Sequence, residues 1–204
     1  MSERFTPGAV VGGGCGTMKF AYADPPYLGQ GRKLYGQHHA EASIWDDPEE
    51  HRKLIAHLAA QFPDGWALSA SAPSLKTILP MCPDGTRIAP WVKSFCAFKK
   101  GVRPCYAWEP VLFWGGRNTN HPPPEKGGKQ TTPKDYYEDW TEVTGVVSPI
   151  ALKKGLTGAK PEAVCRWILD LLNVQAGDTV VDLFPGTGVM GRVAAEITGV
   201  LHVA

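Results

Sequence analysis

The sequence predicts an α/β fold with a doubly wound, mostly parallel sheet. Short apolar segments with strand character alternate along the chain with segments of helical period, which is the pattern of such folds. One apolar segment, Met18–Ala23, is ended by two prolines, and another, Thr179–Leu183, leads into a glycine turn and a helix. The chain of 204 residues is 43% hydrophobic, so one domain with a substantial core is expected over 18–204.

The first strand is expected at Met18–Ala23, because Pro25 and Pro26 cannot donate to a sheet ladder. A helix follows, with Asp47 as N-cap and Pro48 at its first position. Its apolar face is marked by Leu54, Ile55, Leu58, Ala59 and Phe62.

The remaining elements follow the same alternation. An antiparallel strand or hairpin is expected around Ala107–Trp114, and the strands that end at Ala23 and Leu183 are expected to be neighbours in the centre of the sheet. Further strands are predicted at 66–69 and 87–98, and further helices at 74–81, 161–172 and 189–197.

Three segments lack such periodicity. Residues 1–17 are glycine-rich and are expected to form a flexible leader. Residues 28–44 are polar and contain three glycines, which predicts a mobile loop over a site. Residues 115–150 contain few aliphatic side chains and are expected to be a surface excursion without a core.

The formal net charge of +1 excludes a protein that is basic as a whole. The charge is uneven, because residues 99–160 carry ten Lys and Arg against six Asp and Glu, whereas residues 161–204 carry two against five. The basic middle section is the natural face for phosphates, and a solvated basic loop is the alternative.

Cysteine and histidine spacing indicates no metal site. The five cysteines are scattered, so they are expected to be reduced and structural, and His38 and His39 have no ligand-spaced partners. No apolar run reaches the length of about 18 residues that a membrane span requires, and the first residues do not resemble a signal peptide, so a cytoplasmic protein is expected.

Asp24-Pro25-Pro26-Tyr27 directly follows an apolar strand. The prolines leave carbonyl groups free of ladder bonds, so the Asp24 carboxylate and a backbone carbonyl can both accept from one amino group. An exocyclic base amine is a weak nucleophile because its lone pair is delocalised, and two such acceptors would aim that lone pair at an electrophile while Tyr27 stacks on the base. A structural proline turn is the alternative for the tetrapeptide taken alone.

The segment from Val180 to Gly188 reads as a strand, a glycine turn and a helix start. Glycines allow a ligand to approach the backbone, and the helix N-terminus presents unpaired N–H groups. A dinucleotide, a phosphate or an adenosyl group would suit it, but the missing third glycine and the missing lysine disfavour the first two. A structural turn is again the alternative.

Together, the two motifs resemble those of S-adenosylmethionine-dependent DNA amino-methyltransferases, in which Asp-Pro-Pro-Tyr is usual for adenine N6 enzymes. The catalytic motif precedes the cofactor motif, as in their circularly permuted group, and Lys160-Pro161 is similar to an element beside the methionine part of the cofactor. Trp91-Val92-Lys93 and the segment 108–112 also resemble the related messenger-RNA adenosine methyltransferases.

The resemblance implies a Rossmann-like methyltransferase that uses S-adenosyl-L-methionine to methylate adenine N6 in DNA, as a monomer or homodimer. It implies a catalytic role for Asp24, Pro25, Pro26 and Tyr27. It also implies a cofactor site formed by Ala23, Asp24, Lys160, Pro161, Asp182, Leu183, Phe184, Gly186, Thr187 and Gly188. Residues 99–150 are the candidate target-recognition insertion.

Several points stay open at this level. Tyr35 is a candidate for stacking on the base, and Lys93 either contacts phosphate or pairs with an acid. The family generally places an acid for the ribose hydroxyls after the glycine helix, but residues 199–204 contain none, so ribose binding is expected to come from elsewhere or to be weak. The alternative functions are methylation of cytosine N4, RNA adenine or a protein amide, and nucleic-acid binding without catalysis.

Overall fold

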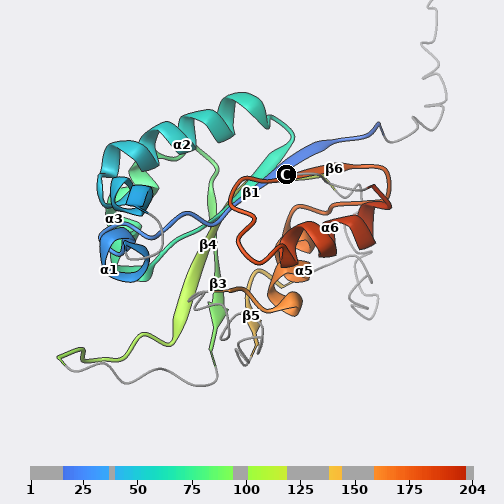
Figure 1. Ribbon diagram of the computed structural model, residues 1–204. Coiled ribbons are helices and arrows are strands. Elements are labelled where there is room, and N and C mark those ends of the chain that lie inside the picture. The colour runs from blue at the N-terminus through green and yellow to red at the C-terminus, as the bar shows by residue number, and fades with distance from the viewer. Residues whose placement is uncertain (1–15, 37–39, 94–100, 119–137, 144–158, 201–204) are drawn as a thin grey trace, which may run out of the picture.

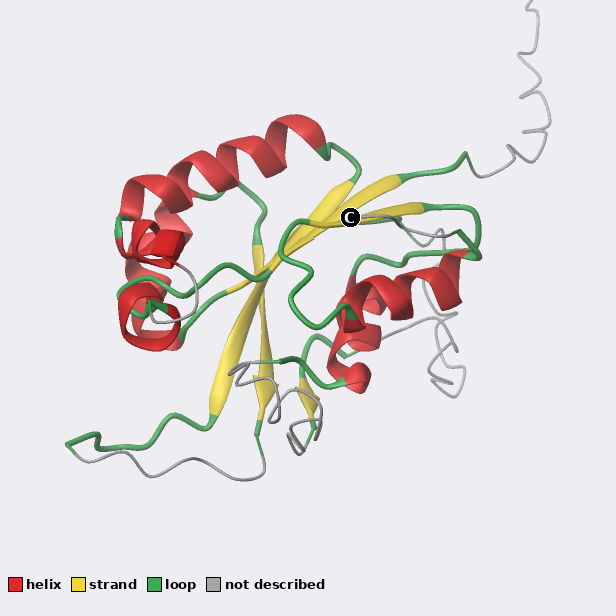
Figure 2. Cartoon of the chain, viewed as in Figure 1, coloured by secondary structure: helices red, strands yellow, loops and turns green. Residues whose placement is uncertain are grey.

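The computed structural model describes residues 16–36, 40–93, 101–118, 138–143 and 159–200. In these residues a central sheet separates two groups of helices, with α1, α2 and α3 on one face and α5 and α6 on the other (Figures 1 and 2). The helices are α1 Gly31–Tyr35, α2 Pro48–Gln61, α3 Leu75–Ile78, α5 Glu162–Leu171 and α6 Val189–Thr198. None of the helices in these ranges is long and apolar enough to cross a bilayer.

The described strands form one six-stranded sheet in the order β5-β3-β4-β2-β1-β6. Only β4 runs antiparallel to its neighbours, which confirms the mostly parallel sheet and the antiparallel strand expected near residue 108. The strands are β1 Lys19–Ala23, β2 Gly65–Ser69, β3 Arg87–Val92, β4 Trp108–Gly115, β5 Thr141–Glu142 and β6 Thr179–Asp182.

β1 pairs in parallel with β2 on one side and with β6 on the other, so the strand order reverses at β1. The predicted pairing of the strands that end near Ala23 and Leu183 is therefore confirmed. Their predicted central position is wrong, because β6 is the last strand in the described order. Val180 packs into the core on one face of the sheet, and Val181 packs against the core on the other face. Because its side chains are covered in this way, β6 is apolar although it has one neighbouring strand in the described sheet.

Each face of the sheet has its own core. On one face, Val164, Ile168 and Leu172 of the α5 region pack with Val193 of α6 against Phe20 of β1. On the other face, Leu54, Ile55 and Leu58 of α2 pack against Trp66 and Leu112. The α2 helix begins as the sequence predicts, because the Asp47 side chain accepts from the Glu49 N–H at 2.9 Å.

The segment 28–44 differs from the expected loop, because it contains α1 and the first part of a 3₁₀ helix, η1 Ala40–Asp46. The Asp46 carboxylate accepts from the N–H groups of Gly31 (2.7 Å) and Arg32 (3.1 Å), and it thereby ties η1 to the start of α1. A Cβ atom at Gly31 would lie 2.0 Å from the Ala42 carbonyl oxygen, so the glycine permits a close approach of two ordered segments.

The segment 115–150 also contains sheet structure, in contrast to the expectation. The short strand β5 pairs in parallel with β3. The Trp91 indole donates to the Val143 carbonyl (3.2 Å), and the Trp167 indole donates to the Glu138 carbonyl (3.1 Å). The described part of this segment is thus joined to the core through two backbone carbonyl groups that accept from core tryptophans, although the segment has few aliphatic side chains. The predicted leader lies outside the described residues except for 16 and 17, as do His38 and His39.

Candidate active site

The segment after β1 crosses the carboxyl edge of the sheet, where the strand order reverses. The hydrogen bonds between β1 and β6 continue as far as Leu183, whose N–H donates to the Tyr22 carbonyl at 2.9 Å. Pro25 and Pro26 then follow β1. The Gln30 N–H donates to the Tyr27 carbonyl at 2.8 Å and closes a turn. Asp24 and Tyr27 are therefore presented at the edge where open α/β sheets bind ligands.

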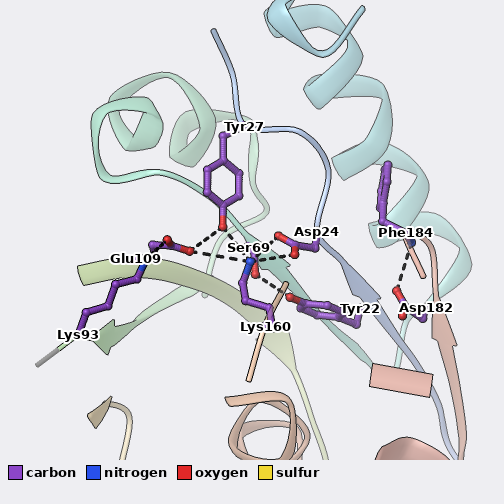
Figure 3. A network of polar contacts seen from close by, with 9 residues as sticks. All are labelled: Tyr22, Asp24, Tyr27, Ser69, Lys93, Glu109, Lys160, Asp182 and Phe184. Carbon is purple, nitrogen blue, oxygen red and sulfur yellow. Dashed lines mark hydrogen bonds and ion pairs between the residues drawn. The ribbon is translucent and has the colours of Figure 1, made fainter. Parts of the chain in front are cut away.

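The ammonium of Lys160 lies against both oxygens of the Asp24 carboxylate. The distances are 2.9 Å to Oδ1 and 2.8 Å to Oδ2, and the Lys160 side chain is 5% exposed (Figure 3). Burial raises the pKa of Asp24, and the charge of Lys160 offsets part of this rise. Burial alone would lower the pKa of Lys160, but Asp24 and Glu109 raise it overall, so the lysine stays protonated.

Tyr27 joins this ion pair to a second one. Its hydroxyl accepts from the Lys160 ammonium (3.0 Å) and donates to Glu109 Oε2 (2.8 Å), while Glu109 Oε1 accepts from the ammonium of Lys93 (Figure 3). Burial tends to raise the pKa of Glu109, but Lys160 and Lys93 hold it below its ordinary value. Burial, together with the negative charges of Asp24 and Glu109, raises the pKa of Tyr27, which is therefore neutral.

A cavity of about 540 Å³ opens beside the Asp24–Lys160 pair. Its walls come from the end of β1, from the α1–η1 segment, from the start of α5 and from the glycine turn after β6. The lining includes Tyr22, Asp24, Pro26, Tyr35, Glu41, Ala42, Ile44, Trp45, Ala159, Lys160, Cys165, Asp182, Leu183, Phe184, Pro185, Gly186, Thr187, Val189 and Met190. The two sequence motifs therefore meet across one pocket.

The glycine turn forms the floor of this pocket. Gly186 (φ 47°) and Gly188 (φ 76°) have left-handed backbones, and Gly188 directly precedes α6. A Cβ built on Gly186 would lie 3.7 Å from the Phe184 carbonyl oxygen, an ordinary van der Waals contact, so the left-handed backbone and not crowding is what favours glycine here. Burial raises the pKa of Asp182 to about 6, although the Phe184 N–H donates to its Oδ1 at 3.2 Å.

An aromatic wall connects the glycine turn to η1. The rings of Trp45 and Phe184 meet edge to face with centroids 5.1 Å apart, and Trp45 meets His51 of α2 in the same way at 5.4 Å. A ring nitrogen of His51, Nε2, lies 2.9 Å from the Trp45 carbonyl oxygen. These contacts hold η1 at the wall of the pocket. The pocket therefore has an apolar part lined by Trp45 and Phe184 and a charged part formed by Asp24 and Lys160.

The structure brings most of the predicted site residues together. Nine of them line the pocket, namely Asp24, Pro26, Tyr35, Lys160, Asp182, Leu183, Phe184, Gly186 and Thr187. The lining does not include Ala23, which is buried in the core, or Pro25, Tyr27, Lys93, Pro161 and Gly188.

Sequence reasoning missed several residues of the site. Tyr22, whose hydroxyl lies 2.8 Å from Ser69 Oγ, was assigned to a strand core, and Trp45 and Glu41 were assigned to a loop or its border. Glu109 was noticed only as part of a segment with family resemblance. An acid within an otherwise apolar strand is the signal that identifies Glu109, since a buried carboxylate needs partners. The described residues contain no group of three potential metal ligands.

Comparison of the whole chain with known proteins identifies its class of fold. No family model and no curated protein sequence matches the chain. Solved structures do match, and they show that the chain has the Rossmann-like α/β fold of M1.HpyAVI.

M1.HpyAVI, crystallised as a complex with SAM, superposes with a TM-score of 0.51 and 14% identity over 88% of this chain and 77% of that chain. A second structure of M1.HpyAVI gives 0.50 and 15% identity over 88% and 75%. TTHA0409, a putative DNA modification methylase from Thermus thermophilus complexed with S-adenosyl-L-methionine, gives 0.48 and 16% identity over 89% and 78%. At such identities the likeness concerns the fold alone.

Proposed function

We propose that this protein transfers a methyl group from S-adenosyl-L-methionine to the exocyclic N6 amine of adenine in DNA. The observation that carries the proposal is that Asp24 and Pro26 of the first motif line the same pocket as residues 182–187 of the glycine turn. Structural likeness to SAM-bound M1.HpyAVI supports the choice of cofactor.

The pocket has the volume and the chemistry that this cofactor needs. A cavity of about 540 Å³ is within the usual range for a ligand of its size. Lys160 offers an ammonium for the cofactor carboxylate, and the edges of Trp45 and Phe184 offer an apolar place for a purine ring. When bound, S-adenosylmethionine supplies an electrophilic methyl group on a sulfonium.

Glu41 is our candidate for the acid that binds the ribose hydroxyls. It is one of three acidic residues among the lining side chains, with Asp24 and Asp182, and it belongs to η1. Asp24 accepts from Lys160, and Asp182 accepts from the Phe184 N–H of the glycine turn. Glu41 is the lining acid that is left to accept from a ligand. We assign the ribose hydroxyls to Glu41.

The residues around Asp24 suit the activation of an amine. A carboxylate that accepts an N–H bond from the base amine would favour a pyramidal nitrogen, and it would stabilise the positive charge that the nitrogen acquires as the methyl group transfers. Lys160 opposes the rise in the pKa of Asp24 that burial causes, and its charge thereby favours the ionised carboxylate. Tyr27 and Tyr35 supply aromatic faces near the amine.

DNA is the proposed substrate, and the target adenine must leave the duplex to reach Asp24. Unstacking and unpairing cost a few kcal/mol, which single-stranded DNA largely avoids. The sequence places its excess of positive charge in residues 99–160, and Glu109 and Lys160 of the site belong to this section. Phosphate binding by this section would position the base at the pocket.

The test uses purified protein, tritiated S-adenosylmethionine and DNA in both single-stranded and duplex form. Transfer is expected in the wild type and is expected to fall at least about a hundredfold in Asp24→Asn, with Asp84→Asn as a matched control on an exposed turn. Digestion of the product to nucleosides identifies N6-methyladenine or N4-methylcytosine.

RNA and protein substrates are assayed in parallel, so that transfer to either one alone would reassign the acceptor. If no acceptor is methylated and Asp24→Asn binds cofactor as the wild type does, the enzymatic proposal fails. Nucleic-acid binding without cofactor binding in calorimetry would support a non-catalytic binder instead.

A further inference from the structure

The ammonium of Lys93 is paired with the carboxylate of Glu109, and the Lys93 side chain is 30% exposed. Lys93 follows β3 directly, and its backbone N–H donates to the Ala107 carbonyl at 2.8 Å. Its side chain passes over the ring of Trp91, with the ammonium 4.6 Å from the ring centroid, and ends on Glu109 Oε1. Glu109 lies on β4 opposite Trp91, so this arrangement is set by the register of two paired strands.

The two oxygens of Glu109 have different partners. Oε1 accepts from Lys93, and Oε2 accepts from the hydroxyl of Tyr27. The turn closed by Gln30 holds the backbone of Tyr27, and Glu109 and Lys160 hold the hydroxyl at the far end of the ring. The direction of the Glu109 carboxylate therefore contributes to where the ring of Tyr27 lies.

We propose that Lys93 is a positioning residue that acts through Glu109 to hold Tyr27 in place for the acceptor base. The proposal rests on the function proposed above, in which Tyr27 faces the base. It also decides between the two roles that the sequence left open for Lys93, in favour of pairing with an acid.

The charge balance of the cluster explains why the lysine is needed. Two carboxylates, Asp24 and Glu109, face two ammonium groups, Lys160 and Lys93. Without Lys93, both carboxylates would share Lys160, which lies 2.8 Å from Asp24 but 3.8 Å from Glu109. Glu109 would then bind a proton at higher pH, and the neutral carboxyl accepts from Tyr27 more weakly than the carboxylate does.

Groups from several elements act on Glu109 in this cluster. They are Lys93 after β3, Asp24 and Tyr27 after β1, Lys160 before α5, and Tyr35 of α1. Tyr27 has a raised pKa and Lys160 stays protonated, so Asp24 and Glu109 are the groups of this cluster whose charge changes on the acid side.

The experiment compares the wild type with Lys93→Met, Lys93→Arg and the matched control Lys53→Met. Lys53 donates to Glu50 on the surface of α2, so its loss removes a similar pair remote from the site. In Lys93→Met we expect the acid limb of the kcat/KM profile to move to higher pH, with a loss of about tenfold at pH 6 and a smaller loss at pH 8. Lys93→Arg is expected to recover most of the loss.

A phosphate contact predicts a different result. The slope of log affinity for DNA against log salt would then become shallower by about one in Lys93→Met, with no movement of the acid limb. That outcome would overturn the proposal, and so would a Lys93→Met profile that is uniformly lower at every pH.

A second readout is independent of methyl transfer. The carboxyl carbons of ¹³C-labelled glutamate are titrated by NMR, with Glu109→Gln to assign the signal. The pKa of Glu109 is expected to be higher in Lys93→Met than in the wild type and unchanged in Lys53→Met. If the wild type methylates nothing, the function proposed above fails while this titration still tests the pairing; an unchanged Glu109 titration overturns the role of Lys93 by itself.

Discussion

Lys160 donates to both carboxylate oxygens of Asp24, although the two residues are 136 positions apart in the chain. This ion pair joins the segment after β1 to the segment before α5, and it stands at the charged end of the pocket.

The ion pair itself can be tested through stability. Lys160→Met leaves the Asp24 carboxylate, 21% exposed, without its charged partner, so the free energy of unfolding is expected to fall by about 3 kcal/mol at pH 7. The double variant Asp24→Asn/Lys160→Met removes both charges and is expected to recover at least half of this loss. Urea denaturation measures both values, and Lys53→Met should stay within about 0.5 kcal/mol of the wild type. A double variant no more stable than Lys160→Met would argue against the pair.

Asp182 makes stability depend on pH. Its pKa in the folded protein is about 6, raised from an ordinary value of 3.8, so the folded state binds the proton more tightly than the unfolded state does. This contribution is fully present below about pH 4 and is lost as the pH rises through about 6. Asp182→Asn is therefore expected to raise the free energy of unfolding by about 2 kcal/mol at pH 8 and to change little at pH 4. Denaturation at both pH values measures this, and an equal gain at each would contradict the assigned cause.

Glu41 is expected to affect the ribose end of the cofactor. Glu41→Gln removes the charge of the acceptor but keeps the shape of the side chain, and calorimetry is expected to show S-adenosylmethionine binding weakened by about tenfold. Glu49→Gln on the exposed start of α2 is the matched control. An analogue that lacks one ribose hydroxyl should bind wild type and Glu41→Gln with similar affinity. If Glu41→Gln weakens both ligands equally, the carboxylate does not contact that hydroxyl.

Gly31 is expected to be required for the wall that η1 contributes. A Cβ at this position would lie 2.0 Å from the backbone oxygen of Ala42, so Gly31→Ala must displace α1 or η1. We expect a loss of about 2 kcal/mol in the free energy of unfolding, together with weaker cofactor binding. Gly191→Ala within α6 is the control, because no atom lies within 4 Å of its Cβ, and it should stabilise by up to about 1 kcal/mol. Thermal unfolding and calorimetry compare the two, and equal behaviour would show that the close approach at Gly31 is unimportant.

The regular elements were largely predictable from local signals. The start of α2 follows from Asp47 and Pro48, and the antiparallel strand at 108–115 follows from an apolar run between turns. The helical structure in the segment 28–44 was not predictable in this way, because its glycines are typical of loops. One of them, Gly31, instead permits the packing of α1 against η1, a contact between segments that no local pattern contains.

The pairing partners of the site were the least predictable part. Asp24 and Lys160 were each identified from motifs, but their direct ion pair was not, and Glu109 was not recognised as the residue that joins Tyr27 to Lys93. A carboxylate or an ammonium in a sequence indicates that a partner is needed, but many candidates satisfy that need equally well.

The sequence by itself determined the alternation of strands and helices, the helix cap at Asp47 and the two motifs, because backbone propensity and capping act within a few residues. Only the tertiary structure decided that Asp24, Glu109 and Lys160 share one cluster, that β6 lies at the end of the described sheet and that η1 forms a wall of the pocket. These relationships depend on strand order, register and the burial of charge, which arise from contacts between residues far apart in the chain.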